Sequence, residues 1–387
     1  MNFSAKPIWL VGFRPFFTLV CLSGMALPAL WVAMFAGWIE APSLAKAGMQ
    51  WHAHEMFFGF GGALLGGFLL TSSKNWVKIR GYHGASLIFL VLAWLFERLG
   101  MWCGGAWPQP VFLLSNQLFL VALVAMLLWT LLRHRATDGY RRDNIFFLIL
   151  LPLLPVAKFL LLYVAWPQTG QTMTLALFRL AFLIMLERTL TEFMKGVFKV
   201  QILRHPLLDG AIKTLALALV FAPFLPSFAT LALALALALL LLIRFAFWQP
   251  KLAFSRIDIA VMHLGYLAIV AQLLALASEQ IAQTVWVGSV TTHLFTFGVI
   301  GVIAPGMIVR ISKGHTGRKV MFDAGDKAAL WLMIAALALR LLAPQLAPDA
   351  YLIWISLAAA CWATAFAILT WRVVPFLFQP RLDGREH

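Results

Sequence analysis

The sequence predicts an all-α membrane protein: a bundle of about twelve transmembrane helices that forms a single integral domain over residues 1–387. Hydrophobic residues make up 62% of the chain and charged residues 12%, whereas soluble domains average about 45–50% apolar and about 25% charged residues. Apolar runs of about 20 residues, the length that crosses a bilayer, recur along the whole chain. Lysine and arginine gather between alternate runs, which is the pattern of a polytopic membrane protein.

The apolar runs follow one another with short connections, and the longest connection is about a dozen residues, so no soluble domain is expected. The predicted spans are 15–38, 51–73, 84–103, 111–132, 145–166, 172–195, 210–224, 227–247, 258–278, 290–310, 326–343 and 350–374. The run 210–224 is short for a span. Residues 230–243, "TLALALALALLLLI", carry only apolar bulk, which predicts a lipid-facing helix.

The positions of the basic residues support this number of spans, because their groups all fall on one side of the predicted membrane. Their groups along the chain are Lys6 and Arg14; Lys74, Lys78 and Arg80; Arg133, Arg135, Arg141 and Arg142; Lys195, Lys199 and Arg204; Arg244, Lys251 and Arg256; Arg310, Lys313, Arg318 and Lys319; and Arg372, Arg381 and Arg385. The opposite loops hold almost none, so both termini are predicted to be cytoplasmic. The first run is expected to remain as a span and not to be a cleaved signal.

The net charge of +15 therefore reflects the gathering of basic residues on one side of the predicted membrane. Because the positive residues are spread over short loops and form no single patch, no nucleic-acid partner is expected. Anionic lipid headgroups suffice as partners. The three cysteines, Cys21, Cys103 and Cys361, are isolated, so they predict neither a disulfide framework nor a cysteine-rich metal site.

Two spans resemble each other when they are aligned from a histidine. The stretch "HEMFFGFGGALLGG" begins at His54 and "HLFTFGVIGVIAPG" begins at His293, and phenylalanine and glycine positions match. Simple halving of twelve helices would pair the second span with the eighth, so this match is no plain duplication. Two glycine-rich packing helices that converged by chance are the alternative.

The ionisable residues at the start of the second span are the leading candidate site, because charged and imidazole groups inside a membrane are costly and usually functional. Trp51, His52, His54, Glu55 and Met56 lie together in "WHAHEM". His52 and His54 would point about 200° apart on a regular helix, so both can bind one ion only where the helix is unwound. Otherwise they face two different sites.

Imidazole, carboxylate and thioether are ligands that copper or haem iron accepts. His293 is expected at the same membrane depth as His54, which makes it a candidate ligand of the same metal. His263, in "HLGY", can bind a second haem or metal or can join a structural network. His315 lies in a basic glycine turn, "SKGHTGRK", where closing a helix hairpin is the plainer role. His83 and His134 are expected to be solvated.

Glycines on these two spans allow two interpretations. Gly59, Gly62 and Gly66 remove the side chains from one face of the second span, and Gly298, Gly301 and Pro305 do much the same on the tenth. Such faces let helices approach each other closely, and they would equally let a porphyrin lie against the helix.

A set of charged residues within the fifth and sixth predicted spans is expected to be buried: Lys158, Arg179, Glu187, Arg188 and Glu192. Lys158 is alone in its run and must find a carboxylate, for which Glu187 or Glu55 is expected. Arg179 and Arg98 are the candidates to bind the propionates of a haem.

Several of these stretches together resemble the NnrS family of bacterial twelve-helix membrane proteins. The motifs are "LVGFRPFF", "WHAHEM.FGF", "GGFLLT...NW", "HLGY", "HLFTFGVIG" and "R.S.GHTGR". The resemblance directs attention to Arg14, Trp51, His52, His54, Glu55, Asn75, Trp76, His263, His293, Arg310, His315 and Arg318. It implies a nitric oxide response and the presence of haem and copper. The family's glycine, arginine and proline motif is absent from "LERTLTEFMKG", where only Arg188 matches.

The leading functional hypothesis is a haem- and copper-binding protein of the bacterial inner membrane that protects against nitric oxide. A twelve-helix secondary transporter or metal exporter is the alternative, although transporters are expected to show clear repeats. A respiratory-type haem–copper reductase would need adjacent histidines, and the sequence has no His-His pair. The sequence predicts neither the oligomeric state nor whether the protein is an enzyme.

Overall fold

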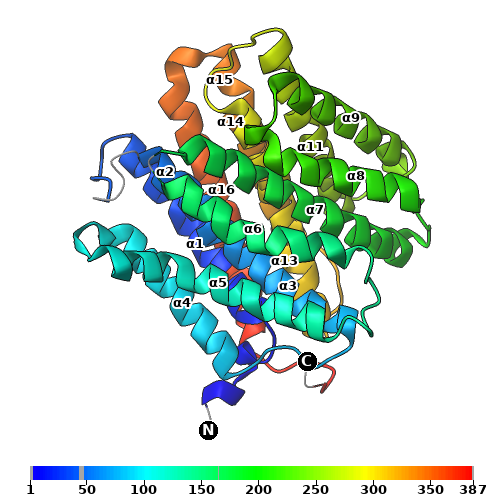
Figure 1. Cartoon of the computed structure of the whole chain (residues 1–387). Helices are drawn as coiled ribbons and strands as arrows, with labels where there is room; N and C mark the ends of the chain where they lie inside the picture. The colour runs from blue at the N-terminus through cyan, green and yellow to red at the C-terminus, as the bar shows by residue number, and fades with distance from the viewer. Residues whose placement is uncertain (1–2, 43–47, 164, 386–387) are drawn as a thin grey trace. The chain divides into compact units, whose positions relative to one another are not determined.

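The computed structural model describes residues 3–42, 48–163 and 165–385, and this part of the chain is helical without any strand (Figure 1). Eleven of its helices or continuous helix combinations are long and apolar enough to cross a membrane. They are α1 (Phe13–Phe35), α2 to α3 (Gly48–Val77), α4 with η4 (Ala85–Ala106), α5 (Gln109–Arg133), α6 (Asn144–Leu162), α8 with η5 (Pro206–Phe224), α9 (Ser227–Ala246), α11 (Ile257–Ile281), α12 to α13 (Val290–His315), α14 with α15 (Ala324–Leu346), and η7 with α16 (Pro348–Leu377).

The predicted span 172–195 lies within α7 (Pro167–Phe198), a more polar helix that is not among these eleven. The side chain of Arg14, at the start of α1, donates to the backbone carbonyls of Leu377 (2.9 Å) and Gln379 (2.7 Å) at the end of α16. Because the first and last spans meet at one end, the chain crosses an even number of times, and α7 makes the twelfth crossing. The predicted helix bundle is confirmed, and the cytoplasmic location of this end stays a prediction.

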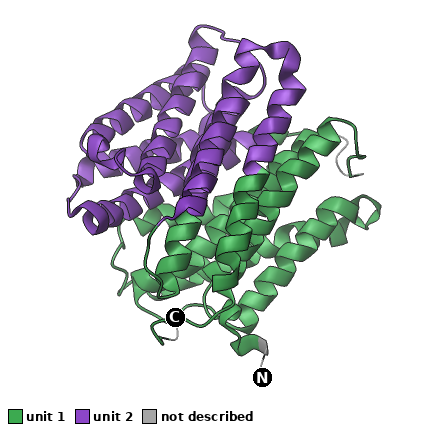
Figure 2. Ribbon diagram, turned by 180° about the vertical axis from the view of Figure 1, so that it is seen from behind, with its two compact units in different colours: residues 1–170, 307–321, 363–387 green, residues 171–306, 322–362 purple. Residues whose placement is uncertain are grey.

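The chain divides into two compact units (Figure 2). Unit 1 comprises residues 1–170, 307–321 and 363–387, and unit 2 comprises residues 171–306 and 322–362. In unit 1, α3 packs between α1 and α5, and α5 packs against α4 and α6. In unit 2, α11 packs against α9 and α12, and α8 packs against α9. A single domain over 1–387 stays a prediction.

Each unit contains one span that widens into a π-helix at the aligned position. The span from α2 (Gly48–His54) continues through the π-helix η3 (Glu55–Gly61) into α3 (Gly62–Val77). The span from α12 (Val290–Phe295) continues through the π-helix η6 (Thr296–Gly301) into α13 (Val302–His315). π-Helical turns are rare and occur mostly at functional sites. The internal similarity seen in the sequence therefore extends to an uncommon backbone conformation.

The glycine faces of both spans are filled by neighbouring side chains. A Cβ added to Gly66 would lie 2.9 Å from Leu123 of α5, and one added to Gly67 would lie 2.8 Å from the Cβ of Phe16 of α1. In unit 2, a Cβ on Gly298 would lie 2.6 Å from the Cβ of Ala268. These distances are shorter than real Cβ contacts, so the glycines serve close helix packing. The interpretation that a porphyrin lies on either glycine face is therefore wrong.

Candidate functional site

Five ionisable side chains meet inside unit 1, within the predicted membrane spans. We call His54, Glu55, Glu97, Arg98 and Lys158 the unit-1 cluster; His54, Glu97 and Lys158 are completely buried and Glu55 is nearly so. Burying charge in a bilayer is unfavourable unless the charges are paired. Its two carboxylates, Glu55 and Glu97, balance its two cations, Arg98 and Lys158.

Three spans deliver these side chains to one place. His54 is the last residue of α2 and Glu55 the first of the π-helix η3, Glu97 and Arg98 lie on α4, and Lys158 lies on α6. The wider turn of η3 is held in place by α4, because Trp94 donates its indole N–H to the Gly59 carbonyl at 3.0 Å. The π-helical turn thus coincides with the polar cluster.

His54 is the centre of the cluster. Its Nδ1 lies 3.0 Å from Glu55 Oε1, and its Nε2 lies 3.1 Å from Glu97 Oε1. The amide of Asn116 on α5 lies 3.0 Å from the same Nε2. Both ring nitrogens are therefore engaged by the protein, and the imidazole joins two buried carboxylates.

The cations complete the cluster. Arg98 Nη2 lies 2.8 Å from Glu97 Oε1 and Arg98 Nε lies 3.2 Å from Glu55 Oε2. Lys158 forms an ion pair with Glu97 and donates to the Asn116 carbonyl. The Glu97 oxygens and the Arg98 nitrogens lie within ion-pair distance but lack hydrogen-bond geometry, so small shifts of these side chains would change their pairing.

The expectation that Lys158 pairs with Glu187 or Glu55 is wrong, because its partner is Glu97. Glu97 lies in an otherwise apolar run beside Arg98, and the two residues look like a self-paired couple in the sequence. The rule that any ionisable group inside a span is a candidate applies to Glu97 as much as to Lys158 and would have made Glu97 a candidate site residue, although it does not pair the two.

The other residues of "WHAHEM" face elsewhere in unit 1. The ring of His52 stacks on Trp31 of α1 with centroids 4.4 Å apart, whereas His54 faces α4 and α5. Trp51 is buried beside Trp102, with ring centroids 5.9 Å apart, and Met56 is half-buried. His52 and His54 thus face two different surroundings, which was one of the two arrangements predicted.

His293 lies in unit 2, in α12. Its Nδ1 lies 2.7 Å from the Ser289 carbonyl oxygen, to which it donates in the tautomer that has the proton on Nδ1. Arg340 Nη2 lies 3.3 Å from the same nitrogen; because a guanidinium can only donate, that contact is a hydrogen bond only in the other tautomer. Arg340 Nη2 also lies 3.2 Å from the hydroxyl of Tyr351. The ring also packs against Phe297 at 5.8 Å.

His263 of α11 is completely buried in unit 2 and is surrounded by aromatic rings. Its Nε2 lies 3.2 Å from the Trp248 carbonyl oxygen and its Nδ1 3.4 Å from that of Ile259. The rings of Phe245, Trp248 and Phe254 meet it at steep angles, with centroids 5.9, 6.5 and 6.3 Å away. This arrangement fits the structural network better than a metal ligand.

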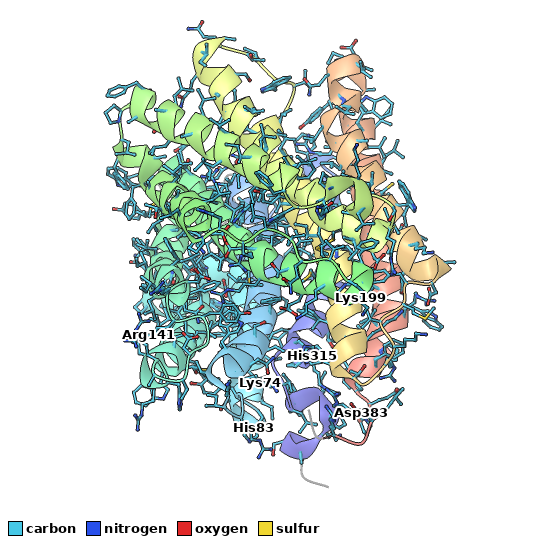
Figure 3. All side chains as sticks on the ribbon, turned by 90° about the vertical axis from the view of Figure 1, so that its right-hand side faces the viewer. Lys74, His83, Arg141, Lys199, His315 and Asp383 are labelled. Carbon is cyan, nitrogen blue, oxygen red and sulfur yellow. The ribbon has the colours of Figure 1, made fainter. Side chains whose placement is uncertain are left out.

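His315 ends α13 in unit 1, where its ring packs on Phe13 at 5.5 Å. The carbonyl of His315 accepts from Arg381 Nη1 at 2.9 Å, and Arg318 Nη2 donates to Gln379 at 2.6 Å. The glycine turn therefore anchors the chain beyond α16, and Figure 3 shows His315 and Asp383 at this end of the unit. Arg310 lies more than one turn before His315 on α13 and is half-buried.

The anchored tail predicts a pH dependence. Two contacts with Arg381, at 2.9 and 2.6 Å, hold the pKa of Asp383 well below its usual range. A carboxylate with a lowered pKa stabilises the fold above its ordinary pKa and loses that effect as the pH falls through the lowered value. We expect Asp383→Asn to speed amide hydrogen exchange of residues 381–385 at pH 7 and to change it little under strongly acidic conditions. Equal exchange at pH 7 would contradict this.

Unit 2 holds a second buried charge network. Arg244 Nη1 lies 3.0 Å from both Glu187 Oε2 and Asp209 Oδ1. Lys213 lies 3.2 Å from Glu187 and Arg204 pairs with it as well. Arg179 lies apart and donates to Gln272 at 2.9 Å. Arg188 is buried, as expected, whereas Glu192 is exposed. The expectation that Glu192 is one of the buried charges is therefore wrong.

The residues of the described ranges do not gather into a metal cluster: no group of three or more His, Cys, Asp or Glu side chains there can hold an ion. Copper held by His54 and Glu55 does not fit the arrangement, because both nitrogens of His54 have protein partners. Haem iron needs only one or two axial ligands. His293 fits that requirement best, because metal-bound imidazoles usually donate the other N–H to a carbonyl, as its Nδ1 does to Ser289.

Comparison with known proteins gives one match of full extent. The family model described as NnrS protein matches residues 7–381 of the 387. The match includes both π-helical spans and the unit-1 cluster, and it ends at Arg381, where the anchored tail begins. No curated protein matches the chain.

Proposed function

Because the chain belongs to the NnrS family, we propose that this multi-pass membrane protein binds haem and copper in the bacterial inner membrane and protects the cell against nitric oxide. The family match over residues 7–381 is the observation that carries the proposal. Nitric oxide is small, apolar and soluble in the bilayer, so a site within the spans needs no polar channel to receive it.

The proposed haem contact is His293. In the tautomer that donates from Nδ1 to Ser289, Nε2 carries the lone pair that a haem iron would need. Arg340, beside His293 and Tyr351, is a better candidate for a propionate than Arg98 or Arg179, because Arg98 already pairs with two carboxylates and Arg179 with Gln272. Bound haem iron would supply the centre at which nitric oxide binds.

The direct test is to purify the folded protein and to measure its optical spectrum and its iron and copper content. A haem Soret band that shifts when nitric oxide is added without oxygen would support the proposal. A strain lacking the protein should also grow more slowly than the parent in the presence of a nitric oxide donor. Well-folded protein that contains neither haem nor copper would overturn the proposal.

Substitution of single histidines distinguishes the candidate ligands. We expect His293→Ala to lower the haem content per protein by about tenfold or more, because loss of ligands or of their supporting contacts typically costs about 10–100-fold in affinity. His263→Ala and His54→Ala should retain most of the haem, and His83→Ala, on an exposed loop, is the control. Haem loss is measured from the absorbance ratio of Soret band to protein. Full haem retention in His293→Ala would rule out this ligand.

One observation favours the alternative, a secondary transporter or metal exporter. Transporter binding sites are often built from irregular helix segments at corresponding positions of two repeats, and the π-helical turns η3 and η6 are local irregularities in two otherwise continuous helices. Substrate-dependent flux into proteoliposomes that is abolished by His54→Ala would support a transporter. Flux unchanged by this substitution would argue against the unit-1 cluster as its binding site.

A further inference from the structure

The arginines of two sequence motifs meet at one residue of the C-terminal tail. Arg14, in "LVGFRPFF", donates from Nη1 to the backbone carbonyl of Gln379 at 2.7 Å. Arg318, in "GHTGR", donates from Nη2 to the side-chain oxygen Oε1 of Gln379 at 2.6 Å. All three residues belong to unit 1. Two guanidinium groups that are far apart in the sequence therefore lie beside one amide, and we call Arg14 and Arg318 the arginine pair.

Within the described ranges, no carboxylate is bonded to the arginine pair. Arg14 is completely buried, and its side chain donates to the carbonyls of Leu377 and Gln379. Arg318 contacts the Gln379 amide and the ring of Phe376, whose centre lies 4.1 Å from the guanidinium carbon. These partners are neutral oxygens and an aromatic face. They satisfy part of the hydrogen-bonding capacity but leave both charges without a counter-ion.

Asp383, the acidic residue of the described tail, is already engaged by a third arginine. It accepts hydrogen bonds from Arg381 Nε at 2.9 Å and from Arg381 Nη2 at 2.6 Å. The charges of Arg318 and Arg381 both repel that of Arg14, so the three guanidinium groups lie near one another. One carboxylate offsets one of these three charges, and the place as a whole favours an anion.

The arginine pair also has buried donors without an acceptor. Nε and Nη2 of Arg14 and Nη1 of Arg318 are enclosed by protein and make no hydrogen bond. Buried donors are nearly always satisfied in folded proteins. Nε and Nη2 together form one edge of a guanidinium, the fork that binds two oxygens of a phosphate or carboxylate at once. The unsatisfied edge of Arg14 therefore fits an oxyanion.

The side chain of Gln379 holds a place that an oxygen of such an anion can take. Its Oε1 is the acceptor of Arg318 Nη2. Gln379 is exposed and Arg318 is half-buried, so the amide can rotate outward and a ligand can enter from the surface. One ligand oxygen then replaces Oε1, and the others approach the unsatisfied edge of Arg14.

The position of the arginine pair is the headgroup level of a bilayer. Arg14 lies at the start of the span Phe13–Phe35, Arg318 follows the span Val290–His315, and Gln379 follows the span Pro348–Leu377. Spans pass from apolar sequence into loops at this level, where phosphate groups of lipids and of the surrounding water are both within reach.

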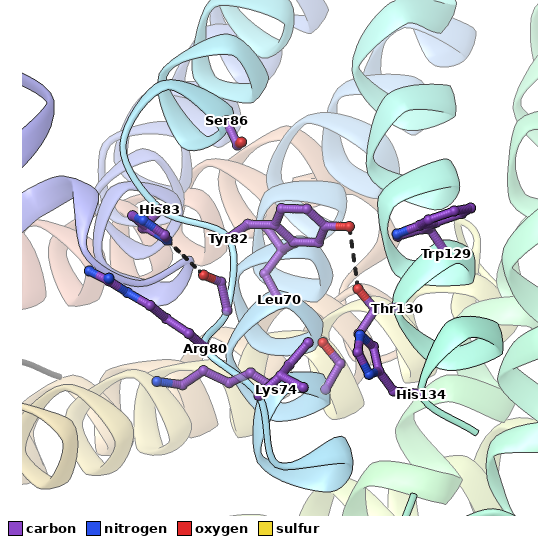
Figure 4. A pocket seen from close by; sticks show the side chains of 12 residues that line it. Leu70, Lys74, Arg80, Tyr82, His83, Ser86, Trp129, Thr130 and His134 are labelled. Atoms are coloured by element: carbon purple, nitrogen blue, oxygen red, sulfur yellow. Dashed lines mark hydrogen bonds between the residues drawn. The ribbon is translucent and has the colours of Figure 1, made fainter. Parts of the chain in front are cut away.

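A cavity at the same end of unit 1 is separate from the arginine pair. It has a volume of about 410 Å³, and its lining includes Lys74, Arg80, His83 and His134 but neither arginine of the pair (Figure 4). Lys74 and Arg80 have further interaction partners. His83 is exposed, as expected, and His134 is half-buried. His83→Ala is therefore a control for general disturbance of this end of the unit.

We propose that Arg14 and Arg318 form a binding site for a phosphate group, which displaces the side-chain amide of Gln379 when it binds. The headgroup of an anionic phospholipid and free phosphate share this chemistry, and the experiment distinguishes the two sources. The inference does not depend on the haem or nitric oxide assignment.

Gln379→Glu tests the proposal while both arginines stay in place. The new carboxylate offsets one charge of the pair and occupies the place of the ligand, so we expect phosphate binding to fall by about tenfold or more. Arg318→Gln should lower it to a similar extent. Arg14 is not replaced, because it also holds the start of α1 to the end of α16.

Two measurements on the full chain in zwitterionic detergent report binding. Inorganic phosphate should raise the unfolding temperature of the wild type more than chloride does at equal ionic strength, because a ligand of the folded state stabilises it. Native mass spectrometry compares retention of phosphatidylglycerol with that of phosphatidylcholine. Gln379→Glu should unfold at a higher temperature than the wild type without any ligand and should gain little from phosphate.

The matched control is Lys319→Gln, which removes one charge from the exposed position next to Arg318. It should bind as the wild type does, as should His83→Ala. A preference for phosphatidylglycerol that is lost in Gln379→Glu and Arg318→Gln would identify the lipid headgroup as the ligand. Stabilisation by phosphate that is lost in the same variants, without a lipid preference, would identify free phosphate. Wild-type binding in both variants, or no binding of either probe by the wild type, would overturn the proposal.

Discussion

Replacement of Lys158 by methionine is expected to lower the free energy of unfolding by about 3–5 kcal/mol, the usual effect of removing one partner from a buried ion pair. The Lys158 ammonium group is completely buried and pairs with Glu97. Without it, Glu55 and Glu97 share only Arg98 as a full counter-charge. Unfolding in mixed micelles with increasing sodium dodecyl sulfate measures this free energy.

The double variant Lys158→Met/Glu97→Gln distinguishes pairing from packing. Removal of both charges restores a neutral cluster, so we expect it to recover about 1–3 kcal/mol relative to the sum of the single variants. Lys327→Met, at an exposed position of α14, controls for the change in side-chain type. Strictly additive effects of Lys158→Met and Glu97→Gln would show that the ion pair makes no coupled contribution.

The sequence predicted the helices well because bilayer length and apolar composition determine them directly. Each of the twelve predicted runs corresponds to one span, from 15–38 in α1 to 350–374 in α16. α7 differs from the other spans in composition, because its charged residues Glu187 and Arg188 lower its mean hydropathy. Its crossing follows from the contact of Arg14 with Leu377, at 2.9 Å, because the positions of the two ends require an even number of spans.

The candidate site was only partly predictable. The sequence singled out His54 and Glu55, since ionisable groups in an apolar run are conspicuous, and the structure places both in the unit-1 cluster. It could not supply the partner of Lys158, because helices that are adjacent in space need not be adjacent in sequence: α4 and α6 both face α5. The π-helical turn η3 could not be predicted either, because its composition is that of an ordinary glycine-rich helix.

The sequence also could not choose between uses of the glycines. Spacing of three and four residues predicts a small-residue face, and both a neighbouring helix and a flat ligand fit such a face. The decision lies in which side chains occupy it: Leu123 against Gly66, and Trp362 against Gly301, where an added Cβ would be 2.6 Å away. Those neighbours come from spans far away in the sequence.

Replacement of Arg244 by methionine is expected to be about as destabilising as the change at Lys158, near 3–5 kcal/mol. Arg244 is 1% exposed, donates from Nη1 to Glu187 and Asp209 at 3.0 Å each, and donates from Nε to the Tyr266 hydroxyl at 3.2 Å. Its guanidinium also lies 4.8 Å from the centre of the Trp248 ring. Arg244 thus joins the carboxylates of Glu187 and Asp209 to the aromatic rings of Trp248 and Tyr266.

Arg244→Lys separates charge from geometry. The ammonium group keeps the positive charge but cannot donate in the planar fork that reaches Glu187, Asp209 and Tyr266 together, so we expect an intermediate loss of about 1.5–3 kcal/mol. Arg256→Met is the matched control, because Arg256 pairs with Asp258 at 3.1 Å while its side chain is 44% exposed, and exposed pairs contribute about 0–1 kcal/mol. If Arg244→Met were no more destabilising than Arg256→Met in the same micelle titration, the buried network would not be what holds α7, α8 and α9 together.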